Sequence, residues 1–108
     1  MNIDLLYFSG CPSWKRSKEF LNKIIEEKGL DLKINLVHIE TDEEAVLHQF
    51  PGSPTIRLEG SDLFPFDQPD YRLGCRIYQT PNGFQGTPTK EMLEEKLDLA
   101  LKNHSKSE

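Results

Sequence analysis

The chain has 108 residues, with thirteen lysines and arginines against eighteen aspartates and glutamates, so its net charge is −5. This length suits one hydrophobic core and is too short for two domains. The negative charge disfavours the attraction to phosphates on which nucleic-acid binding depends. Hydrophobic residues make up 36% of the chain and charged residues 29%, which is typical of a globular protein. We therefore expect one globular domain with no nucleic-acid partner.

The N-terminal segment predicts a buried strand over Ile3–Phe8, which is aromatic and β-branched and ends at Ser9-Gly10. It lacks the basic segment and long apolar run of a signal peptide. No stretch of the chain approaches the ~20 apolar residues of a membrane span. We therefore expect a cytoplasmic protein with no membrane partner. Its only two cysteines, Cys11 and Cys75, should rest as thiols in such a reducing compartment.

The next segment predicts an amphipathic helix over Ser13–Lys28, with Gly29 where a helix C-cap glycine belongs. The segment Leu32–Ile39 then alternates apolar with polar residues, which predicts a second strand. A strand, a helix and a strand in this order predict a parallel crossover. The apolar positions of the helix are Trp14, Phe20, Leu21, Ile24 and Ile25.

The middle of the chain predicts a short helix and a short strand. Thr41 and Glu44 match a capping box, and a helix from there to about Phe50 would be stopped by Pro51. A strand is expected over Thr55–Leu58. It is followed by a long connection of the kind that is often functional or mobile, running from Glu59 to Gly74.

The last third predicts a strand over Cys75–Gln79, a turn at Pro81-Asn82-Gly83 and a final helix from Pro88. The expected order is β-α-β-α-β-β-α around a mixed four-stranded sheet. Residues 1–102 should form the domain, and the polar residues 103–108 a disordered C-terminal tail.

This order resembles the thioredoxin-like fold superfamily, because a cysteine follows the first strand and Ser53-Pro54-Thr55 precedes the third. The resemblance implies a three-layer α/β sandwich with a cis proline at position 54 beside the reactive cysteine. The opening Gly10-Cys11-Pro12-Ser13-Trp14 is similar to that of small bacterial thioredoxin-like proteins, some of them labelled alkylmercury lyase-like. Trp14 stands where the second cysteine of the family motif would be, so the likeness is to monothiol members.

Cys11 is the first catalytic candidate. Free backbone N–H groups and the helix dipole stabilise an anion just before a helix, which favours a nucleophilic thiolate. Lys15, Arg16 and Lys18 can attract that thiolate or an acidic substrate, or can simply be solvated. The alternative for Cys11 is an inert, buried side chain.

The substrate-binding candidates surround this cysteine. A cis Pro54 would present the backbone of Ser53 to a peptide or thiol substrate by strand addition. Trp14 is either a platform for an apolar substrate group or a packed side chain. The complete set of candidates is Pro12, Trp14, Ser53, Pro54 and Thr55.

Cys75 is the second catalytic candidate, because it can resolve a sulfenic acid or mixed disulfide on Cys11, or join it in holding a soft metal. A direct pair requires Cα atoms within about 7 Å. If the third and fourth strands form a plain hairpin, Cys75 at the start of the fourth lies away from Cys11. This topology favours Cys75 as a core residue.

Three functions follow from these residues. The first is a monothiol redox protein, a thiol-disulfide oxidoreductase without a cofactor, whose Cys11 is resolved by Cys75 or by an external thiol. Its partner would be a protein or small-molecule thiol or disulfide. The second is a non-catalytic adaptor that binds through Ser53-Pro54-Thr55 and the apolar loop Leu63–Phe66. The third is soft-metal or organomercurial handling by the two cysteines. The oligomeric state stays open.

Overall fold

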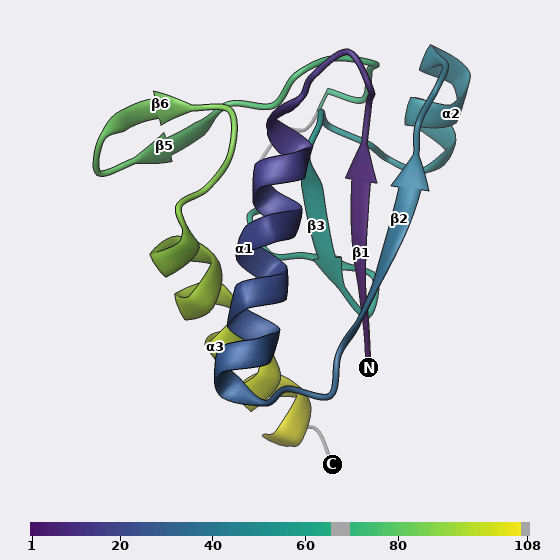
Figure 1. Cartoon of the computed structure of the whole chain (residues 1–108). Coiled ribbons are helices and arrows are strands. Elements are labelled where there is room, and N and C mark those ends of the chain that lie inside the picture. The colour runs from purple at the N-terminus through teal and green to yellow at the C-terminus, as the bar shows by residue number, and fades with distance from the viewer. Residues whose placement is uncertain (66–69, 107–108) are drawn as a thin grey trace.

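A computed structural model describes residues 1–65 and 70–106 of the chain and contains a mixed four-stranded sheet, as the sequence predicts. The strand order is β2-β1-β3-β4 (Figure 1). β1 pairs in parallel with β2, whereas β3 runs antiparallel to both β1 and β4. The strands are β1 (Asn2–Tyr7), β2 (Lys33–His38), β3 (Thr55–Leu58) and β4 (Ser61–Asp62).

Three helices complete the described part of the fold: α1 (Ser13–Lys28), α2 (Asp42–Leu47) and α3 (Lys90–Lys106). α1 connects the parallel strands β1 and β2, which confirms the expected crossover. It ends at Gly29, whose φ of 61° is the left-handed conformation that glycine adopts without strain. α2 begins as its capping box predicts, because the Thr41 hydroxyl accepts the Glu44 N–H at 3.1 Å.

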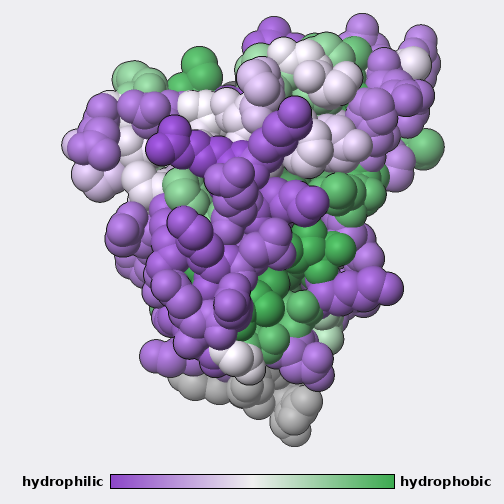
Figure 2. All heavy atoms as spheres, in the orientation of Figure 1, coloured by the Kyte–Doolittle hydropathy of each residue, from purple (hydrophilic) through white to green (hydrophobic). Residues whose placement is uncertain are grey.

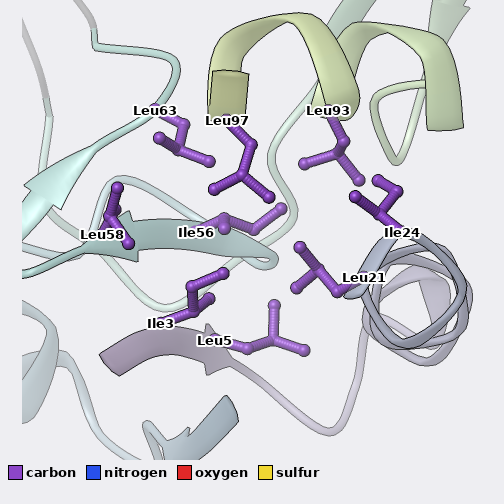
Figure 3. Close-up of a cluster of buried hydrophobic side chains, with 9 residues drawn as sticks. All are labelled: Ile3, Leu5, Leu21, Ile24, Ile56, Leu58, Leu63, Leu93 and Leu97. Atoms are coloured by element: carbon purple, nitrogen blue, oxygen red, sulfur yellow. The ribbon is translucent and has the colours of Figure 1, made fainter. Parts of the chain in front are cut away.

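The helices cover both faces of the sheet. Leu5 and Leu6 are neighbours in β1, so their side chains point to opposite faces. Leu5 packs in the cluster formed with α1 and α3, whereas Leu6 packs with Ala45 of α2. Figure 3 shows the larger cluster, in which every side chain is at least nine-tenths buried. Its members are Ile3, Leu5, Leu21, Ile24, Ile56, Leu58, Leu63, Leu93 and Leu97.

The fourth strand lies elsewhere than the sequence predicts. We expected it at Cys75–Gln79, but β4 follows β3 directly after a tight turn at Glu59 and Gly60. Both turn residues have positive φ, 49° and 88°, as in the two-residue turns that join antiparallel strands. With only two residues, β4 is too short to produce a periodic pattern in the sequence.

The last residues of the expected fourth strand instead belong to a separate two-stranded sheet. β5 (Tyr78–Thr80) and β6 (Gly83–Gln85) pair with each other as a hairpin outside the main sheet. The turn predicted at Pro81-Asn82-Gly83 is confirmed at its tip. In Figure 1 this hairpin stands to one side of the N-terminal end of α1.

The C-terminal helix continues beyond the boundary expected at residue 102, because α3 includes residues 103–106. No glycine or proline interrupts this polar stretch, so nothing in the sequence stops the helix earlier. Residues 107–108 of the expected tail lie outside the described residues.

The outer face of α1 is hydrophilic, and hydrophobic surface gathers beside it on the side of β2 (Figure 2). Leu36 of β2 is 44% exposed. Within the described part of the chain, no helix is long and apolar enough to cross a membrane.

Candidate functional site

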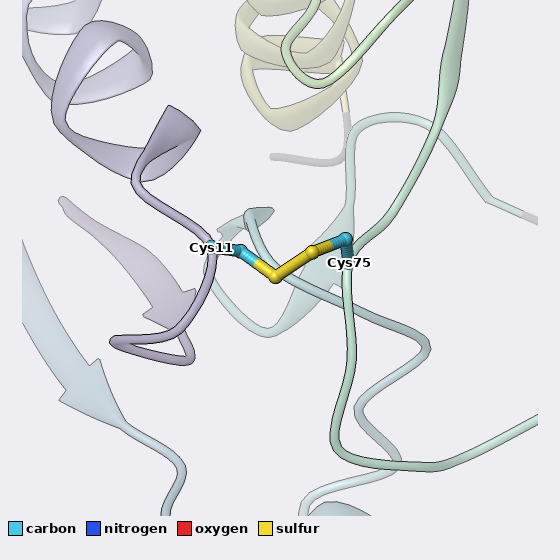
Figure 4. Close-up of a disulfide and its surroundings, with 2 residues drawn as sticks. All are labelled: Cys11 and Cys75. Carbon is cyan, nitrogen blue, oxygen red and sulfur yellow. A yellow bond between two sulfur atoms is a disulfide. The ribbon is translucent and has the colours of Figure 1, made fainter.

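The two cysteines of the chain form a disulfide, although 64 residues separate them (Figure 4). Their Cα atoms are 5.7 Å apart. Cys11 lies in the turn between β1 and α1, where its N–H donates to the Phe8 carbonyl at 3.0 Å. The expectations that both cysteines rest as thiols, and that Cys75 is a core residue away from Cys11, are therefore wrong. The physical reason is the position of β4, which leaves the segment around Cys75 free to return to α1.

Backbone pairing holds Cys75 in place. The Ser53 N–H donates to the Gly74 carbonyl at 2.8 Å, and the Arg76 N–H donates to the Ser53 carbonyl at 2.9 Å. These bonds make a parallel bridge between Ser53 and Cys75. Gly52 makes the approach feasible, because a Cβ there would lie 3.0 Å from the backbone nitrogen of Arg76. Its φ of 138° also favours glycine.

Arg76 anchors the residue next to Cys75. It is only 3% exposed, and its guanidinium donates to Asp62 at 2.9 Å and to the Thr55 hydroxyl at 3.2 Å. It also donates to the carbonyl of Phe64. One buried cation thus ties the segment after Cys75 to β3, to β4 and to the loop that follows β4.

Tyr78 provides a second anchor three residues after Cys75. Its hydroxyl donates to the Pro54 carbonyl at 2.5 Å, and Phe64 packs edge-on against its ring with the centroids 5.3 Å apart. The Arg76 guanidinium lies 4.7 Å from the same ring, within the range of a cation–π interaction. Burial raises the pKa of the Tyr78 phenol above its usual value, because a phenolate is disfavoured away from water.

This buried phenol predicts an alkaline loss of stability. The pKa of Tyr78 is higher in the folded than in the unfolded chain, so the stabilisation of the neutral phenol is complete below about pH 10 and declines above it. Between the pKa of Tyr78 in the unfolded chain and its pKa in the folded chain, the free energy of unfolding should fall by up to about 1.4 kcal/mol per pH unit. Urea unfolding of the wild type and of Tyr78→Phe measures it. The variant should lose about 1 kcal/mol at neutral pH, since its hydrogen bond is gone. The stability difference between the two proteins should shrink as the pH rises, and a constant difference would contradict this account.

The two cysteines differ in exposure. Cys11 is 3% exposed, whereas Cys75 is an exposed residue. Cys11 directly precedes Pro12, the N-cap of α1, whose side chain carries no hydrogen-bond acceptor. The first turn of α1 instead contains Lys15 and Arg16. The helix dipole favours negative charge at Cys11 once the disulfide is opened, whereas Lys15 lies over the Trp14 ring and Arg16 over the Phe20 ring.

The residues between β6 and α3 attach the second end of the hairpin to α1. The hydroxyls of Ser17 and Thr87 share a hydrogen bond of 2.5 Å. Gly86 passes so close to Ser13 that a Cβ on Gly86 would clash with the serine side chain. The hairpin is therefore attached to the start of α1 on both sides, by the disulfide before β5 and by this contact after β6.

The structure places the expected substrate-binding residues around this disulfide. The Ser53–Pro54 peptide bond is cis, as the resemblance implies. Ser53, Pro54 and Thr55 are all buried, and the backbone groups of Ser53 are already bonded to residues 74–76. A peptide that adds to this edge would have to displace that segment. The role of these residues in substrate binding stays a prediction.

Pro12 and Trp14 lie at the start of α1. Pro12 is exposed, and Trp14 is partly buried, with its ring stacked on that of Tyr7 at a centroid distance of 4.1 Å. On its other side, Tyr7 stacks on His38 of β2 at 4.8 Å. The packing alternative for Trp14 is therefore what the structure shows, and a contact between Trp14 and a substrate stays a prediction.

The structure gives less support to the other two expected functions, the binding adaptor and the handling of soft metals. Leu63 belongs to the core and Phe64 packs on Tyr78, so this part of the expected binding loop serves the chain itself, while Phe66 lies outside the described residues. Within the described residues, no group of three or more cysteine, histidine, aspartate or glutamate side chains is arranged to hold a metal ion.

The sequence did not reveal Arg76 and Tyr78 as parts of the site. Their alternation with Ile77 predicts a strand, but hydropathy favours burying the isoleucine. The structure does the opposite, exposing Ile77 and burying the arginine. The pairing of Arg76 with Asp62 leaves no local signal in the sequence.

Comparisons with known proteins add no family to this description. No family model matches the chain, and neither a curated protein nor a solved structure matches it.

Proposed function

We propose that the protein is a thioredoxin-like thiol-disulfide oxidoreductase that works in the cytoplasm through Cys11 and Cys75 as a redox pair. The observation that supports this proposal is the disulfide between an exposed cysteine and a buried cysteine at the start of a helix. Such a disulfide has an exposed residue at one end, and its other end would be released as a thiolate at the start of a helix, which favours negative charge.

The chemistry balances as two successive exchanges. A substrate thiolate attacks one sulfur of the protein disulfide, the S–S bond breaks, and its electron pair leaves on the other sulfur as a thiolate. A second substrate thiolate then attacks the mixed disulfide. The substrate leaves as a disulfide and the protein as a dithiol, with two electrons transferred. The reverse sequence reduces a substrate disulfide, and the relative reduction potentials decide the direction.

The packing of Arg76 and Tyr78 favours a disulfide that opens and closes during catalysis, rather than a permanent structural cross-link. These anchors do not depend on the sulfur–sulfur bond, so they can keep Cys75 beside Cys11 after reduction. In a reducing compartment, lasting disulfides are rare and transient ones are mostly catalytic or redox-sensing. A pair held together in both states is suited to repeated opening and closing.

A turnover assay tests this function. The protein is mixed with an excess of a disulfide-bonded model protein and dithiothreitol, and loss of the substrate disulfide is followed. We expect the rate above background to be proportional to the amount of wild-type protein. Cys11→Ser and Cys75→Ser should each lose nearly all of this rate, since neither can complete two exchanges intramolecularly. Ser105→Cys, which adds a thiol near the C-terminus, is the control for non-specific thiol reactivity. Equal rates for the wild type and the two serine variants would overturn the proposal.

A further inference from the structure

The segment that carries Cys75 alternates between buried and exposed residues. Each buried residue has a role inside the protein: Arg76 and Tyr78 are the anchors described above, and the Thr80 hydroxyl donates to the Gly83 carbonyl at 2.7 Å. The exposed residues are Cys75, Ile77 and Gln79. Ile77 is 65% exposed, which is a large fraction for an isoleucine. The reactive disulfide therefore has an exposed apolar neighbour two residues along the same segment.

The hairpin adds a second apolar side chain. Phe84 of β6 pairs directly with Gln79 of β5, and opposed residues of an antiparallel pair lie on the same face. Phe84 is 73% exposed. Hydrophobic atoms show at the surface on the hairpin side of the molecule, at the upper left of Figure 2. We call Cys75, Ile77, Gln79 and Phe84 the outer strip.

The exposures also distinguish the two cysteine residues as targets. Exchange requires an incoming thiolate to reach the sulfur that it attacks. Cys11 is buried, whereas Cys75 is exposed. Attack at Cys75 expels Cys11 as the leaving thiolate, and this is the favourable choice, because Cys11 lies at the positive end of α1 and a stabilised thiolate leaves faster.

We infer that a polypeptide thiol docks on the outer strip and forms its mixed disulfide with Cys75, while Cys11 is the buried partner that leaves as a thiolate. In the reverse sequence, which reduces a substrate disulfide, Cys11 is the thiolate that resolves the mixed disulfide on Cys75. This inference rests on the proposed redox function and reverses the order of attack that the sequence suggested. The bond that forms joins the polypeptide sulfur to Cys75, and the bond that breaks is Cys11–Cys75. The electron pair goes to Cys11, and the proton of the incoming thiol goes to solvent.

The outer strip favours a polypeptide over a small thiol. A thiol with a few heavy atoms needs only to reach the exposed residue Cys75, and gains nothing from Ile77 and Phe84. An extended peptide with apolar side chains next to its cysteine can cover both residues. If partial burial of these two large apolar side chains is present in the transition state, we expect it to raise the rate about tenfold.

The first test locates the mixed disulfide. Oxidised wild-type protein is mixed with an unstructured single-cysteine peptide, quenched with acid during the first turnover and mapped by mass spectrometry. We expect the peptide on Cys75. Recovery mainly on Cys11, or equally on both, would overturn the inference. Because this measurement uses one turnover of the wild type, it gives an answer even if the catalytic assay fails and needs no variant to fold.

The second test examines the outer strip. The rate of disulfide opening is measured with a peptide whose cysteine is flanked by leucines, with the same peptide carrying serines, and with 2-mercaptoethanol. The ratio of the leucine-peptide rate to the 2-mercaptoethanol rate should fall about tenfold in Ile77→Ser/Phe84→Ser. Leu47→Ser, at a residue of α2 that is 78% exposed, should keep the wild-type ratio. Equal rates for the two peptides, or the same fall in the Leu47 variant, would overturn the inference.

Discussion

Replacing Cys11 and Cys75 together by serine is expected to lower the free energy of unfolding by about 4 kcal/mol. The disulfide closes a loop across a sequence separation of 64 residues, and a cross-link of this span restricts the unfolded chain by about that amount. A domain of this size is stable by only about 5–15 kcal/mol, so this is a large part of the total. By thermodynamic linkage, the folded state must stabilise the disulfide by the same free energy.

Urea unfolding with and without dithiothreitol measures this effect. The wild type should unfold at a lower urea concentration when reduced, and the double serine variant should unfold at the same concentration in both conditions. A wild-type midpoint that does not respond to the reductant would mean that the disulfide does not form in solution or does not stabilise the fold.

Replacing Arg76 by methionine is expected to cost about 3 kcal/mol. Removing one partner of a buried ion pair leaves the other without its compensating charge. Here Asp62, whose side chain is 17% exposed, would lose its partner, and the Thr55 hydroxyl and the Phe64 carbonyl would each lose a donor. Because the arginine adjoins Cys75, the variant should also hold the two cysteines together less well after reduction. Its disulfide should then be easier to reduce than that of the wild type.

Two measurements on Arg76→Met separate these effects. Thermal unfolding of the oxidised protein reports the stability, and equilibrium with defined dithiothreitol ratios reports the reduction potential. The same substitution at Arg72, an exposed arginine four residues earlier, is the matched control and should change neither value appreciably. An Arg76 variant that resembles the Arg72 variant would show that the buried network does not position Cys75.

The elements of the fold with strong local signals were predicted well. The bounds of α1 follow from its apolar spacing and from Gly29, and those of β3 from the run between Pro54 and Glu59. The capping box at Thr41 marks the start of α2 correctly. These signals lie within a few residues of the element they define, so the sequence alone can reveal them.

The site was predicted only in part, because its assembly depends on distant contacts. The position of Cys11 before a helix and the cis proline at 54 follow from local motifs and a resemblance. The proximity of Cys75 does not, since it depends on the two-residue strand β4 and on Arg76 reaching Asp62 across fourteen positions. Two cysteines 64 residues apart carry no sign of their pairing unless the topology between them is known.

A redox titration of Cys11 and Cys75 is the decisive test of whether they form a redox pair. The protein is equilibrated in buffers of defined thiol-disulfide potential, alkylated, and analysed by mass. A functional redox pair requires both cysteines to convert together between dithiol and internal disulfide in one reversible two-electron transition, in which about 30 mV changes the ratio tenfold. Two thiols that remain alkylatable at every potential, or that pair only with the buffer thiol, would contradict it.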